Sequence, residues 1–149
     1  MVFVLFSYLQ TNSDEFKAET GEQFPTEVIF NGEDLVHHHA RDHQQYGRDL
    51  LKKLFSVNEL ASSILLPNDK YKRPHLDIAR MSVFKNAVRT KYKISAQKWD
   101  EFFQKCMHRT LTQCLCDIRK KLKAQQQLQQ ATDEQQATDG QQPQQATTN

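Results

Sequence analysis

The stretch from Ser95 to Lys123 constrains the fold most, because its apolar and its basic residues both recur at helical spacing. The apolar positions form one stripe along a helix: Trp99, Phe103, Met107, Leu111, Leu115, Ile118 and Leu122. The opposite face carries cations, namely Lys98, Lys105, Arg109, Arg119, Lys120 and Lys123. Lys121 is expected close to the apolar stripe. One side of this helix therefore needs a core to cover it, while the other faces water or a partner.

Capping signals mark the start of this helix and of the helices before it. Ser95 is an N-cap candidate, with Ile94 and Trp99 as a hydrophobic staple. Ser56 and Glu59 have the spacing of a capping box, which predicts a helix from Val57 to about Leu65. Before that box, a helical apolar face is formed from Arg48 onward by Leu50, Leu51, Leu54 and Phe55.

Asp77 predicts a further helix, from Ile78 to about Tyr92. Its expected buried positions are Ile78, Met81, Phe84, Val88 and Tyr92, and its expected outer positions are Arg80, Lys85, Arg89, Lys91 and Lys93. The β-prone run at 27–31 ends in the turn dipeptide Asn31-Gly32 and predicts a short strand or an extended arm. The fold class that follows is all-α, a compact bundle of four to five helices.

The two ends of the chain differ in composition from its middle. The opening MVFVLFSYLQ is apolar but shorter than the roughly 20 residues that span a bilayer, which favours a strand or a poorly ordered end. Residues 124–149 contain eleven glutamines and the repeated unit QQATD, too few apolar groups to offset the entropy of folding. We therefore predict an acidic arm at 1–32, a helical domain at 33–123 and an unstructured tail at 124–149.

Charge is distributed unevenly along the chain. Residues 1–47 hold two basic and eight acidic residues, 48–123 hold eighteen and seven, and 124–149 hold none and three, giving net charges of -6, +11 and -3. Such a basic middle segment predicts a polyanionic partner. The loop at 67–75 places Lys70, Lys72 and Arg73 around Tyr71, so it is either a grip on a phosphate backbone or a solvated connector.

The sequence carries no arrangement typical of catalysis. It lacks a G-x-S-x-G elbow, a phosphate-binding glycine loop and a dinucleotide fingerprint. Cys106 and His108 point to different faces of one helix, which disfavours a nucleophile and base pair. His39 and His43 have a spacing that zinc can use, but no third or fourth ligand accompanies them. We therefore predict a protein without enzymatic activity, small-molecule substrate, cofactor or metal.

The three cysteines, Cys106, Cys114 and Cys116, all fall on the last predicted helix. Their odd number and helical spacing, without a secretory signal, predict reduced thiols in the cytoplasm or the nucleus.

Several segments together resemble the BEN domain. They are DLLKKLFSVNELASSIL at 49–65, a basic loop containing proline, RPHLDIARMSVFKNAV at 73–88, and a long helix with one tryptophan that ends in DIRKKLK at 117–123. The marks are the leucines before LFS, the pattern EL-x-SS-x-L and the pattern P-x-L-D at the start of a helix, and they cover about 33–123. A short chain with a low-complexity tail looks most like the single-domain forms of polydnaviruses, the bracoviruses among them.

The resemblance implies a helical fold that binds double-stranded DNA in the nucleus, often as a homodimer on a palindromic site, in transcriptional repression or chromatin regulation. It also implies co-repressors or chromatin proteins as further partners, and no membrane. In the family the final helix approaches the major groove while a nearby loop touches the backbone or the minor groove. These roles would fall on the loop and the last helix: Lys70, Lys72, Arg73, Lys105, Arg109, Arg119, Lys120 and Lys123.

Two other functions stay open at this point. The first alternative is an adaptor that dimerises, or that recruits or titrates repressor complexes, through protein contacts. RNA binding is the less favoured alternative, because Tyr71 is the only aromatic residue on the basic loop and single-strand recognition usually stacks several.

Overall fold

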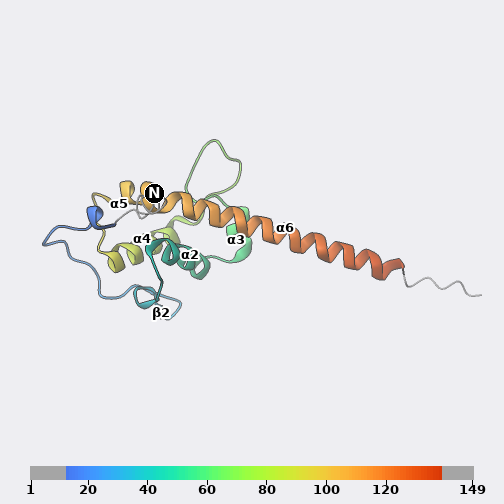
Figure 1. Ribbon diagram of the computed structural model, residues 1–149, viewed down its shortest axis with the longest axis horizontal. Helices are drawn as coiled ribbons and strands as arrows, with labels where there is room; N and C mark the ends of the chain where they lie inside the picture. Colours follow the sequence, from blue (N-terminus) through green and yellow to red (C-terminus); the bar gives the residue numbers. More distant parts are fainter. Residues whose placement is uncertain (1–12, 139–149) are drawn as a thin grey trace, which may run out of the picture.

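A computed structural model describes residues 13–138, and most of this span is helical (Figure 1). The elements in chain order are η1 (Ser13–Phe16), β1 (Ile29–Phe30), β2 (Glu33–Asp34), η2 (Leu35–His37), α2 (His43–Leu54), α3 (Val57–Ser62), α4 (Ile78–Tyr92), α5 (Trp99–Phe102), η3 (Phe103–Met107) and α6 (His108–Thr138). η3 is a π-helical turn, and it joins α5 and α6 into one continuous helix from 99 to 138. The predicted all-α character is thus confirmed.

The apolar stripe of the last helix forms the centre of the core, as predicted. Its first five members, from Trp99 to Leu115, are buried, and Ile118 and Leu122 are half-buried. Phe84 and Val88 of α4 and four residues of α2 belong to the same core: Tyr46, Leu50, Leu51 and Leu54. The long helix therefore does hold the other helices together.

Gly47 lets α2 approach the long helix closely. A Cβ atom at this position would lie 2.4 Å from Met107 Cε and 3.2 Å from Leu111 Cδ2. A larger residue would have to displace core side chains, which costs free energy in a close-packed interior. Gly47 is the packing residue that the helical periodicity did not single out.

The long helix begins three residues later than predicted. Ser95 does not cap it, because the Ser95 backbone N–H donates to Phe16 O at 2.9 Å. The neighbouring Ile94 is buried and forms an isolated antiparallel bridge with Lys17. Residues 94–95 are therefore held in extended pairing with the N-terminal arm, and helical geometry starts only at Trp99.

The other predicted helix starts are confirmed. Glu59 N–H donates to Ser56 Oγ at 3.2 Å while Ser56 N–H donates to Glu59 Oε2 at 2.8 Å, which completes the capping box. Asp77 accepts from the Arg80 N–H at 2.9 Å, and α4 has the predicted bounds. Ile78, however, is 64% exposed, so its predicted burial is wrong; it lies in the first turn, before α4 reaches the core.

Two helices have bounds that differ from the predicted ones. α2 starts at His43 rather than Arg48, because Asp42 caps it by accepting from the Gln45 N–H at 2.8 Å. His39 precedes this helix, so the two histidines do not share a helical face. α3 ends at Ser62 rather than Leu65, because Ile64 pairs with the segment around His75 instead.

The predicted strand exists only as half of a small hairpin. β1 pairs antiparallel with β2, with Ile29 opposite Asp34 and Phe30 opposite Glu33. Asn31 and Gly32 between them both have positive φ, at 50° and 79°, as a tight hairpin turn requires.

The acidic arm is attached to the body over its described part. Phe16 is buried and packs edge-on against Phe102, with 5.6 Å between ring centroids. The Ala18 N–H donates to Lys93 O at 2.7 Å.

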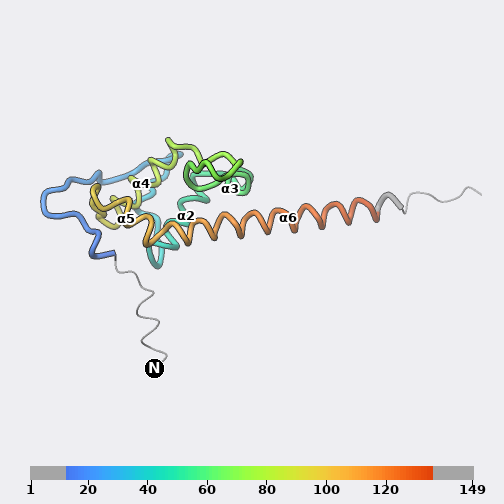
Figure 2. Tube along the Cα trace, turned by 90° about the horizontal axis from the view of Figure 1, so that it is seen from above, coloured from blue at the N-terminus to red at the C-terminus, as the bar shows by residue number. Residues whose placement is uncertain are grey.

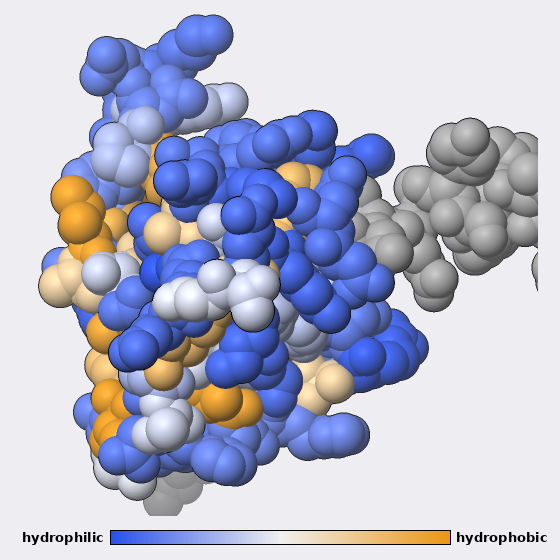
Figure 3. All heavy atoms as spheres, turned by 90° about the vertical axis from the view of Figure 1, so that its left-hand side faces the viewer, coloured by the Kyte–Doolittle hydropathy of each residue, from blue (hydrophilic) through white to orange (hydrophobic). Residues whose placement is uncertain are grey.

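Seen from the end that carries α5, the surface is mostly hydrophilic, with apolar side chains gathered towards one edge (Figure 3).

α6 extends far beyond the helical body, through Thr138 (Figures 1 and 2). The structure thus differs from the predicted unstructured tail over 124–138. All side chains from Lys123 to Gln135 are exposed, so tertiary packing does not order this part. Glutamine and alanine have good helix propensity, and each added residue extends a helix that is already nucleated. The opening MVFVLFSYLQ and residues 139–149 lie outside the described residues.

Candidate nucleic-acid interface

Three predicted site residues on α6 present their charge to solvent. Arg109, Lys120 and Lys123 are exposed, and none of them forms an ion pair within residues 13–138. At 100° per residue, these three side chains point within about one sixth of the helix circumference. Lys121 is also exposed, next to the half-buried Leu122 of the apolar stripe. α6 therefore has a cationic face, which we define as Arg109, Lys120 and Lys123.

Two other cations on the long helix are engaged within the protein. Lys105 Nζ lies 2.6 Å from Glu101 Oε1, one turn earlier on the exposed surface, and this contact raises the pKa of Lys105. Lys98 donates to Glu15 O of the N-terminal arm at 3.2 Å. These residues are less available to a polyanion than the cationic face of α6.

Arg119 has a role in the fold that its place on the basic stripe did not indicate. Its Nε donates to Ala61 O at 2.9 Å and its Nη2 donates to Ser63 O at 3.4 Å. These carbonyls belong to the last turn and the end of α3, where backbone acceptors lack helical partners and a cation is favoured. Arg119 therefore fastens α6 to the start of the basic loop.

The basic loop is closed at its base by backbone hydrogen bonds. Ile64 N–H donates to Pro74 O at 2.8 Å, and Leu76 N–H donates to Ile64 O at 2.9 Å. Near the tip, Asn68 Oδ1 accepts from the Lys70 N–H at 2.9 Å. The loop is therefore a compact surface loop with its ends held together, of the kind that often carries function.

The predicted cations of this loop all point outward. Lys70, Lys72 and Arg73 are exposed, as is Tyr71 at 61%, and the three cations have no ion pair within the described residues. The structure thus confirms an exposed basic loop.

A groove of about 410 Å³ separates the loop from α6. One wall includes Leu66, which precedes the loop, and Tyr71 and Arg73 of the loop. The other wall includes Thr112, Cys116 and Arg119 of α6. The fold therefore brings the cations of the loop and the cationic face of α6 to neighbouring parts of one surface.

Two cations of α2, which the sequence analysis did not select, flank α6 on another side. Burial raises the pKa of the Cys114 thiol, and the charges of Lys52 and Arg48 act in the opposite direction because they lie close to it. Arg48 and Lys52 are four residues apart in α2, so helical spacing was a signal that could have found them.

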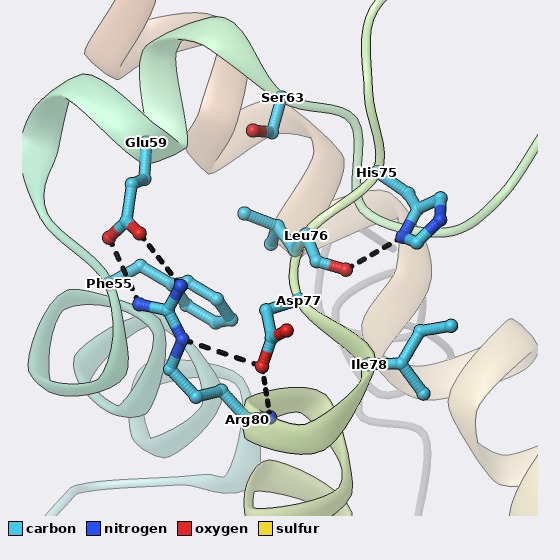
Figure 4. A pocket seen from close by; sticks show the side chains of 8 residues that line it. All are labelled: Phe55, Glu59, Ser63, His75, Leu76, Asp77, Ile78 and Arg80. Atoms are coloured by element: carbon cyan, nitrogen blue, oxygen red, sulfur yellow. Dashed lines mark hydrogen bonds and ion pairs between the residues drawn. The ribbon is translucent and has the colours of Figure 1, made fainter.

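The cations of α4 are, in contrast, used inside the domain. Arg80 donates to Glu59 Oε1 at 2.7 Å, faces Asp77 and lies over the Phe55 ring (Figure 4). Arg89 pairs with Glu22, and Lys91 Nζ donates to Val36 O at 3.0 Å and to His38 O at 2.8 Å. The prediction that they lie on the outside misses these contacts, which join segments distant in sequence.

Within residues 13–138, no group of three or more histidine, cysteine, aspartate or glutamate side chains could hold a metal ion. None of the described helices is both long and apolar enough to cross a membrane. Cys106 and Cys114 are buried, Cys116 is half-buried, and the structure joins none of the three in a disulfide.

Comparisons with models of protein families, with curated proteins and with solved structures found no match.

Proposed function

We propose that this protein binds double-stranded DNA through the cationic face of α6 and the basic loop. The observation that carries the proposal is the presence of six exposed cations without ion pairs on two neighbouring elements of the described chain: Arg109, Lys120 and Lys123 on α6, and Lys70, Lys72 and Arg73 on the loop. A polyanion that neutralises such cations releases counterions from the DNA, which favours binding.

The shape of α6 supports duplex DNA over a small anion. The helix leaves the body after its half-buried residues Ile118 and Leu122, and α3 and α4 lie on one side of it (Figure 2). The major groove of B-DNA is about 12 Å wide and admits one α-helix. An exposed helix with cations and a second cationic element beside it suits a groove and its flanking phosphates.

The resemblance to the BEN domain adds the context of the proposal. It supports sequence-selective binding as a homodimer in the nucleus, in transcriptional repression or chromatin regulation. Arg73 and the α6 cations are the residues whose side chains can read guanine edges or phosphates.

The test is a fluorescence anisotropy titration of the full chain with labelled duplex DNA at several salt concentrations. The variant is Lys120→Gln with Lys123→Gln, and we expect an affinity loss of about tenfold or more and a salt slope smaller by about 1.8, the value for two phosphate contacts. The matched control is Lys17→Gln with Lys93→Gln, which removes the same charge. Lys17 forms the bridge with Ile94 that precedes α5, and Lys93 is next to Ile94, so both positions lie about 30 Å from Lys120 along the helix.

Equal losses in the two variants would overturn the assignment of the interface to α6, because net charge alone would then explain them. Selection from a pool of randomised duplexes completes the test. Enrichment of one palindromic motif would support sequence-selective binding by a homodimer, and salt-sensitive binding without enrichment would contradict selectivity.

A further inference from the structure

We propose that the groove between the basic loop and α6 binds a partner protein through an acidic peptide segment that carries one or two large apolar side chains. This surface is distinct from the cationic face of α6, and the proposal does not depend on DNA binding. It rests on the size of the groove, its apolar floor, its charge and the rigidity of its walls.

The groove has the size and the floor of a peptide-binding site. Its volume of about 410 Å³ lies within the range of small-ligand pockets, about 300–1,000 Å³. Ile64, Leu65, Leu66 and Leu115 line it, and Leu66 is 36% exposed. Apolar surface that is left open to water favours an occupant that covers it with apolar groups.

The polar residues of the groove select the charge of that occupant. Arg73, Arg119, His108 and Thr112 line it, and none of its lining residues, all in the described part of the chain, carries a carboxylate. Arg119 donates two hydrogen bonds to backbone carbonyls. A guanidinium has five N–H donors, so Arg119 keeps donors for a ligand. Carboxylates of a peptide would therefore find donors along the rim.

A sugar-phosphate backbone fits this groove less well than a peptide. Phosphates gain nothing from an apolar floor, because the hydrophobic term requires apolar surface on both partners. Tyrosine and arginine are also enriched among the residues that contribute most to binding in protein interfaces, and here the exposed Tyr71 lines the groove together with Arg73 and Arg119.

The walls are held in place before any partner arrives. The loop is closed by the hydrogen bonds of Ile64, and Arg119 ties the end of α3 to α6. Binding to a preformed groove loses less conformational entropy than binding to a mobile one.

The test uses the full chain and a short fluorescein-labelled peptide of aspartate and glutamate around a central leucine and phenylalanine. We expect saturable binding by fluorescence polarisation, weakened about tenfold by Leu66→Ser and by Tyr71→Ala. Val57→Ser is the matched control, since Val57 is 58% exposed on α3 and lies outside this groove. Two further peptides, one with serine for the apolar pair and one with serine for the acidic residues, should each bind more weakly.

Cys116 provides a readout at the site itself. It lines the groove and is half-buried, while the other two cysteines are buried. The bound peptide should slow its alkylation by iodoacetamide, followed by mass spectrometry. Unchanged Cys116 reactivity, together with unchanged affinity in Leu66→Ser and Tyr71→Ala, would overturn the proposal.

The design separates this proposal from DNA binding. Leu66→Ser should lose the peptide and keep the duplex, and Lys120→Gln with Lys123→Gln should lose the duplex and keep the peptide. Loss of peptide binding in the Lys120→Gln, Lys123→Gln variant would instead show that the acidic peptide binds to the cationic face in place of DNA, which also overturns the proposal. Thermal melts identify any unfolded variant, and Tyr71→Ala, at an exposed loop tip, stays informative if Leu66→Ser unfolds.

Discussion

α4 and α6 are both long cationic helices, but they use their cations in opposite ways. On α4, Arg80 and Arg89 pair with carboxylates, and Lys91 donates to two backbone carbonyls. On α6, Arg109, Lys120 and Lys123 are exposed and have no ion pair within the described residues. Similar patterns of basic residues therefore stabilise the fold in α4, whereas in α6 they leave an exposed cationic surface.

The difference comes from what packs beside each helix. α4 meets acceptors on its neighbouring segments. The N-terminal arm provides Glu22 for Arg89, η2 provides the Val36 carbonyl for Lys91, and α3 provides Glu59 for Arg80. The cationic face of α6 has no such neighbour among the described residues, and beyond Leu122 the helix projects into solvent (Figure 1). The net charge of +11 over 48–123 consequently overstates the charge that a partner can meet, because part of it is already matched inside the domain.

The largest effect in this comparison is expected for Arg89→Ala. Arg89 donates to Ile94 O at 3.1 Å, pairs with Glu22 and lies 5.5 Å above the Phe24 ring, with its side chain 18% exposed. Its loss leaves the Ile94 carbonyl without its side-chain donor and the partly buried Glu22 carboxylate without its cation, although Glu22 keeps the Ala96 N–H as a donor. The free energy of unfolding should therefore fall by about 2 kcal/mol. Chemical denaturation measures this change.

Arg109→Ala is the control for that measurement, since it removes an arginine from the exposed face of α6. It should change stability by less than about 0.5 kcal/mol. Equal destabilisation by the two variants would show that α4 and α6 do not differ in the way the contacts indicate.

The sequence predicted those parts of the fold that depend on local signals. The apolar stripe from Trp99 to Leu115 is buried, and the caps at Ser56 and Asp77 form. The start of the long helix was wrong, because the pairing of Ile94 and Ser95 with residues 16–17 is nonlocal. Capping rules consider only the residues next to a helix start. They therefore cannot predict that a segment distant in the sequence will hydrogen-bond to the candidate cap instead.

The candidate site was predictable in composition but not in arrangement. The exposure of Lys120 and Lys123 followed from helical spacing, and that of the loop followed from its prolines and polar residues. The hydrogen bonds from Arg119 to Ala61 O and Ser63 O could not be predicted from the sequence, because the acceptors of a side chain depend on which element packs beside it. The groove is likewise a product of tertiary packing, formed by two segments that are far apart in the sequence.

Arg119→Ala should have the next largest effect, since Arg119 is the α6 cation that behaves like those of α4. Two carbonyls at the end of α3 lose their donor, and the free energy of unfolding should fall by about 1 kcal/mol. The basic loop should also lose order, which hydrogen exchange of the amides at 64–76 measures. Arg119→Lys should recover stability only in part, because an ammonium group lacks the two-pronged geometry of the guanidinium. Unchanged exchange in Arg119→Ala would contradict this link between helix and loop.

A smaller, pH-dependent effect is expected at the pair that joins α3 to α4. Hydrogen bonds from Arg80 and from the Ser56 backbone lower the pKa of Glu59 from 4.5 to about 2. The unfolded state therefore binds a proton at higher pH than the folded state, so the pair stabilises the fold above about pH 4.5 and its contribution disappears as pH falls towards 2.

Glu59→Gln should remove this dependence. The difference in melting temperature between wild type and variant should shrink as pH falls from neutral to about 3, and the change should be modest because both partners are partly exposed. A difference that stays constant over this range would rule out the charge of Glu59 as its cause.

The smallest effect on stability is expected where the change in charge is largest. Lys120→Glu with Lys123→Glu reverses two charges on the cationic face of α6, yet both side chains are exposed and form no ion pair with an acidic residue in the described chain. The free energy of unfolding should stay within about 0.5 kcal/mol of wild type. A carboxylate at these positions would at the same time repel phosphate, so duplex affinity should fall further than in the glutamine variant. A clear loss of stability would instead mean that α6 depends on these lysines as α4 depends on Arg89, and the contrast between the two helices would fail.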